Sequence, residues 1–521
     1  MVFDVVIICA ATATQEELWQ TRLSSSSSSA FLPPSSLFPP PSSAPAPSSS
    51  SLFVAVHEDW ASSGAGNGLG SLYAYSKARD KAKTLFGVDL DDKLKSGWAA
   101  AIFHTAGKGT RLAPLPGSEN NNKPGVKLPS LLPGEDGFKE LTILEAVIRQ
   151  TNAYAPVRKG RCSVFWGDQV FVPSAGILPS GSHHADILAS LGPMPSEEEW
   201  TQKGLDKYGL IAVNANDDAA QVEKVSYKTA NELLAKFGEI KQVGPSLGSF
   251  SVSASLLFEL MKEFEQELKG KQAKFDSDPH FWMPLTLEED TYVSVMMEKG
   301  ETDATARGHY KRMKSFKERF MQQNNCSAIL GCINVGNNCY WWDYGQLKLF
   351  QKNSLLVTKD SEEAKALREF LQIHNRLQES SGAESYADAS SVILASDIKS
   401  GKIESSVCSR VTAVDVKVSD SILVNVVAKK IVGKNCILYN VVDDSEEGIV
   451  MEDGEVRADV FIPGKEKIVL RSRLDVDGGK AWKVKLDQNT MSFESVYEAN
   501  CDVDVVEAQR EMAQARAKVV F

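Results

Sequence analysis

Short apolar runs alternate with amphipathic stretches over the N-terminal part of the chain. The runs at residues 3–11, 52–56 and 99–103 are apolar except for Asp4, which is typical of strands buried in a parallel sheet. Between these runs, the spacing of the apolar residues favours helices. Strands that alternate with helices predict an α/β fold with a mixed, mainly parallel sheet.

The same alternation continues to about residue 378. We expect further strands at residues 162–166, 208–213, 247–253 and 328–335, and helices at residues 15–23, 72–78, 142–151, 254–268, 298–323 and 359–378. The last of these helices is expected to link two domains.

A different pattern begins near residue 390, where small apolar clusters recur about every five to seven residues, with Gly, Asn, Ser and Asp between them. This spacing is typical of a β-helix, in which each coil buries its apolar side chains only by stacking on the next coil. We therefore predict a first domain over residues 1–377 and a C-terminal β-helix domain over residues 378–521. A charged helix is expected at residues 505–519.

Residues 24–51 consist almost wholly of Ser, Pro and Ala. A segment of this composition buries too little apolar surface to offset the entropy lost on ordering. Because strand-like sequence resumes at residue 52, we predict a disordered insertion within the first domain and not a domain boundary.

Composition narrows the class of protein. The net charge of −11 disfavours a nucleic acid or an anionic membrane as the main partner. No apolar run approaches the roughly 18–20 residues of a membrane helix, and no basic segment precedes the first apolar run, so we expect a cytoplasmic protein. The eight cysteines are scattered without a C-x-x-C pair, which predicts neither a zinc site nor a disulfide framework.

The strongest chemical signal follows the strand at residues 99–103. Gly107 and Gly109 flank Lys108, and Arg111 comes directly afterwards. A strand that leads into a glycine-rich turn brings backbone N–H groups close to a phosphate chain, and arginine can donate two hydrogen bonds to phosphate oxygens. The turn is not a Walker P-loop, and prolines stand where a Rossmann dinucleotide loop would begin its helix.

A second glycine-rich stretch, residues 64–70, precedes this turn by one strand–helix unit. Because both stretches follow predicted parallel strands, they are expected to converge on one edge of the sheet. Gly66 and Gly68 are therefore candidate nucleotide contacts.

The turn resembles the signature of the sugar-1-phosphate nucleotidylyltransferases, approximately G-G-x-G-T-R-L-x-P-L followed by K-P. The matching residues are Gly107, Gly109, Thr110, Arg111, Leu112, Pro114, Leu115, Lys123 and Pro124. Ala106 replaces the first glycine, and residues 117–122 lengthen the segment before the lysine. Residues 3–15, 64–72 and 104–127 are also similar to fucose-1-phosphate guanylyltransferases.

The resemblance implies a GT-A-like (Rossmann-like) fold and a set of site residues. Ala106, Gly107, Lys108, Gly109 and Thr110 would contact the nucleotide, Arg111 would hold the departing pyrophosphate, and either Lys123 or Lys127 would be the catalytic lysine. Asp168, in a G-D pair after a strand, and Asp343, in a W-x-D-x-G segment, would hold Mg²⁺. Glu223, Lys224, Gly248 and Ser249 would contact the sugar phosphate.

The implied reaction converts an NTP and a sugar 1-phosphate into an NDP-sugar and pyrophosphate. The N-terminal likeness favours GTP with fucose 1-phosphate, while a UTP-dependent enzyme and a non-catalytic, regulatory nucleotide-binding homologue remain alternatives. A glycosyltransferase would need a D-x-D motif after a strand, and Asp276-Ser-Asp278 has those letters. The β-helix is an expected contact for homo-oligomers. The sequence leaves the base and the sugar open.

Overall fold

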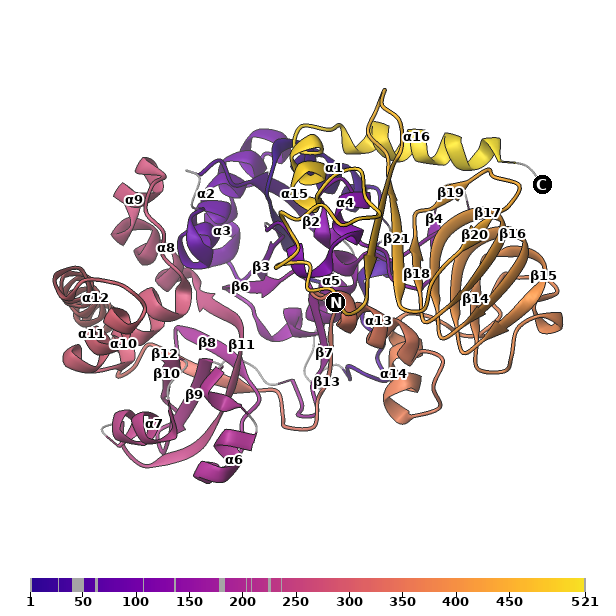
Figure 1. Ribbon diagram of the computed structural model, residues 1–521. Helices are drawn as coiled ribbons and strands as arrows, with labels where there is room; N and C mark the ends of the chain where they lie inside the picture. The colour runs from indigo at the N-terminus through magenta and orange to yellow at the C-terminus, as the bar shows by residue number, and fades with distance from the viewer. Residues whose placement is uncertain are drawn as a thin grey trace.

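The structure is a computed structural model (Figure 1). It describes residues 2–26, 28–39, 51–60, 64–105, 107–134, 137–177, 183–202, 204–207, 209–223, 226–235 and 237–519. Two sheets dominate the described chain, a mixed sheet in its N-terminal part and a separate, mostly parallel sheet in its C-terminal part.

Nine strands of the described chain form the first sheet. They are β1 (Val5–Ala10), β2 (Leu52–His57), β3 (Ala100–His104), β6 (Arg161–Trp166), β8 (Ala185–Ala189), β9 (Gly209–Asn214), β10 (Ala219–Glu223), β11 (Ile240–Ser253) and β12 (Leu330–Asn334). The order is β10-β9-β11-β6-β3-β1-β2, with β8 paired to β11 and β12. Strands β2, β1, β3 and β6 run parallel, whereas β11 pairs antiparallel with β6, β8 and β9. The predicted α/β fold with a mixed sheet is confirmed.

Helices cover both faces of the parallel strands. Alternate residues of β1 enter different cores: Val6 packs in the cluster that contains Trp19, whereas Ile7 packs in the cluster that contains Tyr75. The first cluster is covered by α1 (Ala13–Ser24) and α5 (Ile143–Thr151), and the second by α2 (Gly66–Phe86) and α8 (Ala254–Glu263). The chain therefore forms an α/β/α arrangement in which the carboxyl ends of β2, β3 and β6 lie at one edge.

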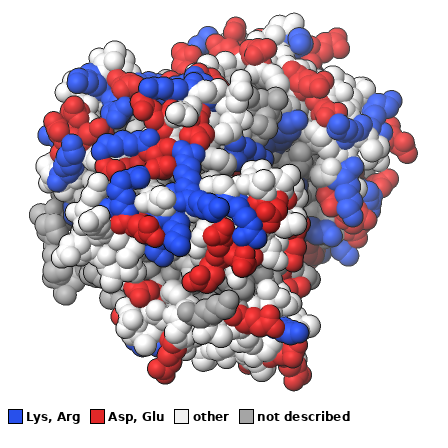
Figure 2. All heavy atoms as spheres, turned by 90° about the vertical axis from the view of Figure 1, so that its left-hand side faces the viewer, with Lys and Arg blue, Asp and Glu red and all other residues white. Residues whose placement is uncertain are grey.

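A helical region extends from the first sheet. It contains α9 (Glu265–Gly270), a π-helical turn (Ser277–Trp282), α10 (Met283–Thr286), α11 (Glu289–Glu298) and α12 (Asp303–Asn324). Figure 2 shows basic and acidic side chains interspersed on this side of the molecule. Ion pairs such as Arg312 with Glu263, at 2.8 Å, account for part of that mixture. The helix expected at residues 298–323 begins later, at Asp303, where Thr302 caps it.

The remaining elements of the first part are short. They are α3 (Leu90–Lys95), α4 (Leu115–Ser118), α6 (Glu197–Gln202), α7 (Tyr227–Leu234), α13 (Leu347–Leu356), α14 (Glu362–Phe370) and the strand pairs β4 (Leu132–Gly134) with β5 (Gly137–Lys139) and β7 (Gln169–Val172) with β13 (Tyr340–Asp343). The linking helix, α14, is shorter than residues 359–378.

The second sheet repeats with a period of 15 residues. Val392, Val407, Ile422 and Ile437 occupy equivalent positions on neighbouring parallel strands. The strands are β14 (Val392–Leu394), β15 (Asp397–Glu404), β16 (Val407–Ser419), β17 (Ile422–Lys434), β18 (Ile437–Tyr439), β19 (Val442–Asp443), β20 (Ile449–Val450), β21 (Glu455–Val460) and β22 (Ile468–Arg473), of which β22 alone in this sheet pairs antiparallel. Residues with left-handed backbone recur at the same interval, at Ala395, Arg410, Asn425 and Asn440. Helices α15 (Phe493–Ala499) and α16 (Val505–Lys518) follow, and Figure 1 shows α16 lying along the sheet.

The two sheets are joined by a continuous apolar core. Val407 and Ile422 belong to the same cluster as Trp19 of α1, whereas their neighbours Cys408 and Leu423 face a core of the second sheet's own. Each parallel strand of this region therefore buries side chains on both faces, which fixes the second sheet against the first domain.

Part of the Ser/Pro-rich stretch is packed and not disordered. Phe31 and Phe38 are 1% and 4% exposed and lie in the cluster that includes Trp19. Two aromatic side chains bury enough apolar surface to hold residues 31–38, so the prediction of disorder does not hold there. Residues 27 and 40–50 lie outside the described chain.

Among the described residues, no helix combines the length and the apolar character needed to span a bilayer.

Candidate functional site

A cavity of about 620 Å³ opens where β2, β3 and β6 end. Its lining combines backbone from two glycine-rich segments with charged side chains: Glu58, Gly64, Gly66, Asn67, His104, Thr105, Gly107, Lys123, Pro124, Trp166, Gly167, Asp168, Gln169, Lys274 and Asp276. The carboxyl edge of parallel strands is the usual position of ligand sites in open α/β sheets, and the volume suits a small molecule. The two glycine-rich segments converge here as expected.

The first glycine-rich segment forms the start of α2. Gly66 has a left-handed backbone (φ +73°), and a Cβ there would lie 2.6 Å from the carbonyl oxygen of Phe275. The N–H of Gly68 donates to the same oxygen at 3.0 Å. Gly66 therefore lines the cavity, whereas Gly68 is buried against Phe275 and does not.

The second glycine-rich segment is the turn after β3. Gly107 (φ +130°) has open space where a Cβ would be, and Gly109 (φ +64°) approaches Lys123, whose Cβ would lie 3.0 Å from an added Cβ. A short 3₁₀ turn, Thr110–Leu112, then carries Arg111 on the exposed surface. Left-handed backbone at both positions explains why glycine occupies them.

Lys123 and Asp168 meet in the cavity. The Nζ atom of Lys123 lies 2.5 Å from Oδ2 of Asp168, which follows directly on the Gly167 turn at the end of β6. Both side chains are largely buried, with 19% and 18% of their surface exposed. An ion pair in such surroundings is shielded from salt much less than a surface pair.

Asp343 lies beside this pair because β13 is antiparallel to β7. The register pairs Asp343 with Gln169, the residue after Asp168. A Cβ added to Gly345 would lie 2.8 Å from Oδ2 of Asp168 and 3.0 Å from Oδ1 of Asp343. Two carboxylates that are 175 positions apart in the chain therefore flank one glycine.

The electrostatics of Asp343 agree with this arrangement. Burial, followed by the negative charge of Asp168, raises the pKa of Asp343 above its usual value, while the N–H of Gly345 and the charges of Lys123 and Arg111 act in the opposite direction. Arg111 thus lies within electrostatic range of Asp343.

The carboxylates can serve as part of a metal site. Among the described residues, no group of three or more His, Cys, Asp and Glu side chains is placed to hold a metal ion. Mg²⁺ is commonly bound through only one or two carboxylates, with phosphate oxygens and water completing the coordination. Asp168 and Asp343, with only glycine between them, fit that pattern.

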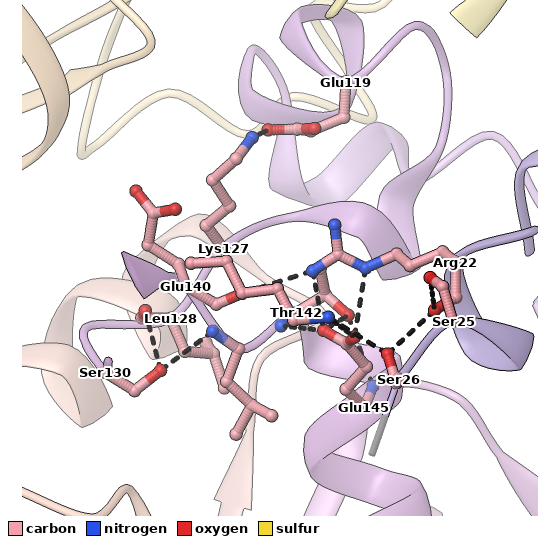
Figure 3. A network of polar contacts seen from close by, with 12 residues as sticks. Arg22, Ser25, Ser26, Glu119, Lys127, Leu128, Ser130, Glu140, Thr142 and Glu145 are labelled. Atoms are coloured by element: carbon pink, nitrogen blue, oxygen red, sulfur yellow. Dashed lines mark hydrogen bonds and ion pairs between the residues drawn. The ribbon is translucent and has the colours of Figure 1, made fainter. Parts of the chain in front are cut away.

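Lys127 lies elsewhere, in the contact with the second sheet. Its ammonium group pairs with Glu119 (Figure 3), lies 5.6 Å from the centre of the Tyr439 ring, and is 3.5 Å from Oδ1 of Asn440. Its backbone N–H donates to the Tyr439 hydroxyl at 2.8 Å. The geometry therefore brings Lys123, and not Lys127, to the cavity.

The residues expected to contact the sugar phosphate are only partly within the described chain. Gly248 (φ +73°) packs against Trp166, since an added Cβ would lie 2.5 Å from the indole Nε1, and Trp166 lines the cavity. Ser249 is 6% exposed. The described residues do not include Lys224, Ala106 or the side chain of Glu223.

Lys108, which was expected to contact the nucleotide, lies over the ring of Tyr497, with Nζ 5.3 Å from the ring centre.

His104 is a cavity residue that the sequence analysis missed. Ser71 donates its hydroxyl hydrogen to the carbonyl oxygen of Asn67 at 2.7 Å, so its oxygen accepts the hydrogen bond from Nε2 of His104 at 2.8 Å. Burial lowers the pKa of His104 to about 4, so the imidazole is neutral at pH 7. The available signal was its position at the end of a buried strand, and Glu58, directly after β2, offered a similar one.

The Asp276-Ser-Asp278 segment follows a loop and not a strand, and it leads into the π-helical turn. Oδ1 of Asp276 accepts the N–H of Asn67 at 3.0 Å and so supports the start of α2. This placement lacks the strand that a D-x-D glycosyltransferase motif requires.

Comparison of the chain with protein-family models and with curated protein sequences gives no match.

Proposed function

We propose that this protein is a sugar-1-phosphate nucleotidylyltransferase, which makes an NDP-sugar and pyrophosphate from an NTP and a sugar 1-phosphate. The observation that carries the proposal is the meeting of Lys123, Asp168 and Asp343 at the carboxyl edge of parallel strands. Arg111, on the glycine-rich turn beside them, completes a site rich in phosphate-binding groups.

The chemistry needs charge neutralisation and positioning more than proton transfer. A sugar phosphate is already largely ionised at neutral pH, so its oxygen can attack the α-phosphorus in line without a general base. Lys123 would balance the charge of the two phosphates that react, and Arg111 that of the departing pyrophosphate. The neutral imidazole of His104, bonded to Ser71, would shape the cavity and transfer no proton.

Asp168 and Asp343 would hold Mg²⁺. When bound, the ion would supply positive charge and orientation for the triphosphate. The ion pair of Lys123 with Asp168 suggests how the site is balanced before substrates arrive: the lysine neutralises one of the two carboxylates. This arrangement leaves Asp343 as the carboxylate whose charge is least compensated, in agreement with its raised pKa.

The detailed fold of the two domains, the contact in oligomers and the cellular location belong to the same proposal. We infer a GT-A-like first domain and a second sheet that is one side of a β-helix, supported by the 15-residue period and the recurring left-handed corners. A β-helix flank would form the contact in homo-oligomers, and a cytoplasmic location agrees with the unpaired state of all eight cysteines.

The test is a pyrophosphate-release assay that combines each common NTP with several sugar 1-phosphates in the presence of Mg²⁺. We expect release with one pair, with GTP and fucose 1-phosphate first and UTP with a hexose 1-phosphate second. Arg111→Ala should lower kcat/KM about 10²–10³-fold, while Arg510→Ala, on the exposed surface of α16, should leave it unchanged. Nucleotide binding without release from any pair would favour the non-catalytic homologue.

A further inference from the structure

A second cavity, of about 400 Å³, lies where the first domain, the second sheet and the C-terminal helix meet. We call it the junction cavity. Its charged lining consists of Arg22, Lys127, Lys139, Glu140, Arg410 and Arg516. These residues come from α1, from the segment before β4, from β5 and the residue after it, from β16 and from α16, and none of them lines the first cavity.

The junction cavity is positively charged, although the chain as a whole carries a net charge of −11. Five cationic side chains line it, against one carboxylate in the lining and two more, Glu119 and Glu145, immediately behind it. The ion pairs are Arg22–Glu145 at 2.8 Å, Lys139–Glu145 at 3.8 Å, Arg410–Glu140 at 3.4 Å and Lys127–Glu119. Among the residues that the structure describes here, five cations therefore face three carboxylates.

Two buried polar atoms at this cavity lack partners among the described residues. Nη1 of Arg516 donates to no described acceptor, while Nη2 donates to the carbonyl oxygen of Arg410 at 3.1 Å. Oε1 of Glu140 is likewise buried without a partner, and Figure 3 shows its carboxylate pointing away from the Arg22–Glu145 pair. Leaving a buried charged group unbonded is costly, so each such atom calls for an explanation.

The charge of Arg516 persists at neutral pH. Burial, followed by the nearby charge of Arg410, lowers the pKa of Arg516 to about 10, and Glu140 acts in the opposite direction. The guanidinium therefore offers a charged donor next to an unbonded carboxylate oxygen. A ligand that accepts hydrogen bonds from the first and donates one to the second would satisfy both atoms.

We propose that the junction cavity binds a phosphorylated polyol, with the phosphate held by Arg516 and Arg410 and a hydroxyl group donating to Glu140. Arginine favours phosphate because its planar fork can donate two parallel hydrogen bonds. The volume of the cavity exceeds what a phosphate ion needs and leaves room for a sugar-sized group. This site is independent of the proposed catalytic reaction, since it shares no residue with the first cavity.

The test measures binding of inorganic phosphate and of a hexose 6-phosphate to the full-length protein by calorimetry at constant ionic strength. We expect the hexose phosphate to bind about tenfold more tightly than inorganic phosphate, because its hydroxyl groups can donate to Glu140 while its phosphate stays on the two arginines. Both ligands should slow amide hydrogen exchange in α16. Ligand binding at the first cavity alone would leave α16 unprotected and would overturn the proposal.

Variants on one helix provide the matched comparison. Arg516→Gln should weaken both ligands about tenfold or more, whereas Arg510→Gln, on the exposed surface of α16, should weaken neither. Glu140→Gln should strengthen binding of inorganic phosphate and remove the advantage of the hexose phosphate, because a negative charge leaves the cavity. The proposed site would be refuted if the Arg516 and Arg510 variants bound the ligands equally tightly. It would also be refuted if inorganic phosphate bound the Glu140 variant and the unmodified protein with the same affinity.

Discussion

The ammonium group of Lys123 lies 2.5 Å from a carboxylate oxygen of Asp168, at the point where the glycine-rich turn meets the end of β6. Gly109 allows this approach, since its left-handed backbone and lack of a side chain leave room for the lysine stem. The ion pair therefore links the glycine-rich turn to the aspartate at the end of β6.

Replacing Lys123 with methionine should abolish most of the activity and preserve the fold. Methionine keeps the apolar stem and removes the charge, so the phosphates would lose a preorganised cation. We expect kcat to fall about 10²–10³-fold, measured by pyrophosphate release, with nucleotide binding retained.

Lys127→Met is the matched comparison, because it changes the same residue type four positions away. Lys127 is 12% exposed and pairs with Glu119, which is 4% exposed. Its loss would leave the buried carboxylate without its ion-pair partner, held only by hydrogen bonds from Tyr439 and Asn440, and breaking a buried pair in this way typically costs about 3–5 kcal/mol. We expect a lower melting temperature with kcat changed only a few-fold, and a large loss of kcat without loss of stability would instead make Lys127 the catalytic lysine.

Gly345→Ala should impair binding of the divalent cation. The added methyl group would lie 2.8 Å and 3.0 Å from the facing oxygens of Asp168 and Asp343 and would occupy the space between them. We expect the affinity for Mn²⁺, measured by calorimetry in the presence of nucleotide, to fall about 10–100-fold. Gly270→Ala, where a Cβ meets open space, should leave the affinity unchanged. Equal affinities in the two variants would exclude the space beside Gly345 as the metal position.

Gly478 should influence catalysis although it lies far along the chain from the catalytic turn. A Cβ at Gly478 would lie 2.3 Å from the carbonyl oxygen of Thr110, so alanine must displace the turn that carries Arg111. A shift of about 1 Å in a positioned group can lower activity about 10²-fold. We expect Gly478→Ala to lower kcat/KM at least tenfold.

Gly308→Ala is the control for Gly478→Ala, and we expect it to cause no loss of activity. Gly308 lies inside α12 with open space at its Cβ position, so alanine should stabilise the protein by about 0.5–1 kcal/mol and leave activity unchanged. A fall in kcat/KM for both glycine variants would contradict a specific role for the contact between Gly478 and Thr110.

Periodic patterns in the sequence predicted the positions of the strands and the α/β fold class. A strand that is buried on both faces of its sheet appears in the sequence as a continuous apolar run. The run before Gly107 became β3, and the clusters after residue 390 became strands with a regular register. The left-handed backbone at Arg410 could not be predicted, since arginine rarely adopts it and the neighbouring strands impose the conformation.

The candidate site was predictable only as far as local motifs extend. Lys123 and Lys127 both lie in one polar segment, and nothing local separates them; the distinction comes from Glu119 and Tyr439, which reach Lys127 from a neighbouring turn and from the second sheet. His104 illustrates the same limit, because its hydrogen bond is to Ser71 of α2, which is far from β3 in local sequence pattern. Long-range packing, absent from any local pattern, decided these cases.

His309 should make the protein sensitive to acid. Its Nε2–H donates to the carbonyl oxygen of His280 at 2.7 Å, and burial, as the largest cause, lowers the pKa of His309 to about 4. The usual pKa of histidine is 6.5, so between pH 6.5 and 4 the unfolded chain binds a proton that the folded protein does not. The free energy of unfolding must therefore fall as the pH falls through this window, by about 3 kcal/mol at full effect.

His309→Gln should remove this contribution, because the amide can donate to the same carbonyl oxygen and carries no titrating proton. We expect the free energy of unfolding in urea to fall between pH 7 and pH 4 by about 3 kcal/mol less than in the unmodified protein. His374→Gln, at an exposed position, is the control and should keep the original pH dependence. If the His309 and His374 variants lose stability in parallel, protonation of His309 does not drive the acid response, and the buried imidazole of His104, whose pKa is also lowered to about 4, becomes the group to replace next.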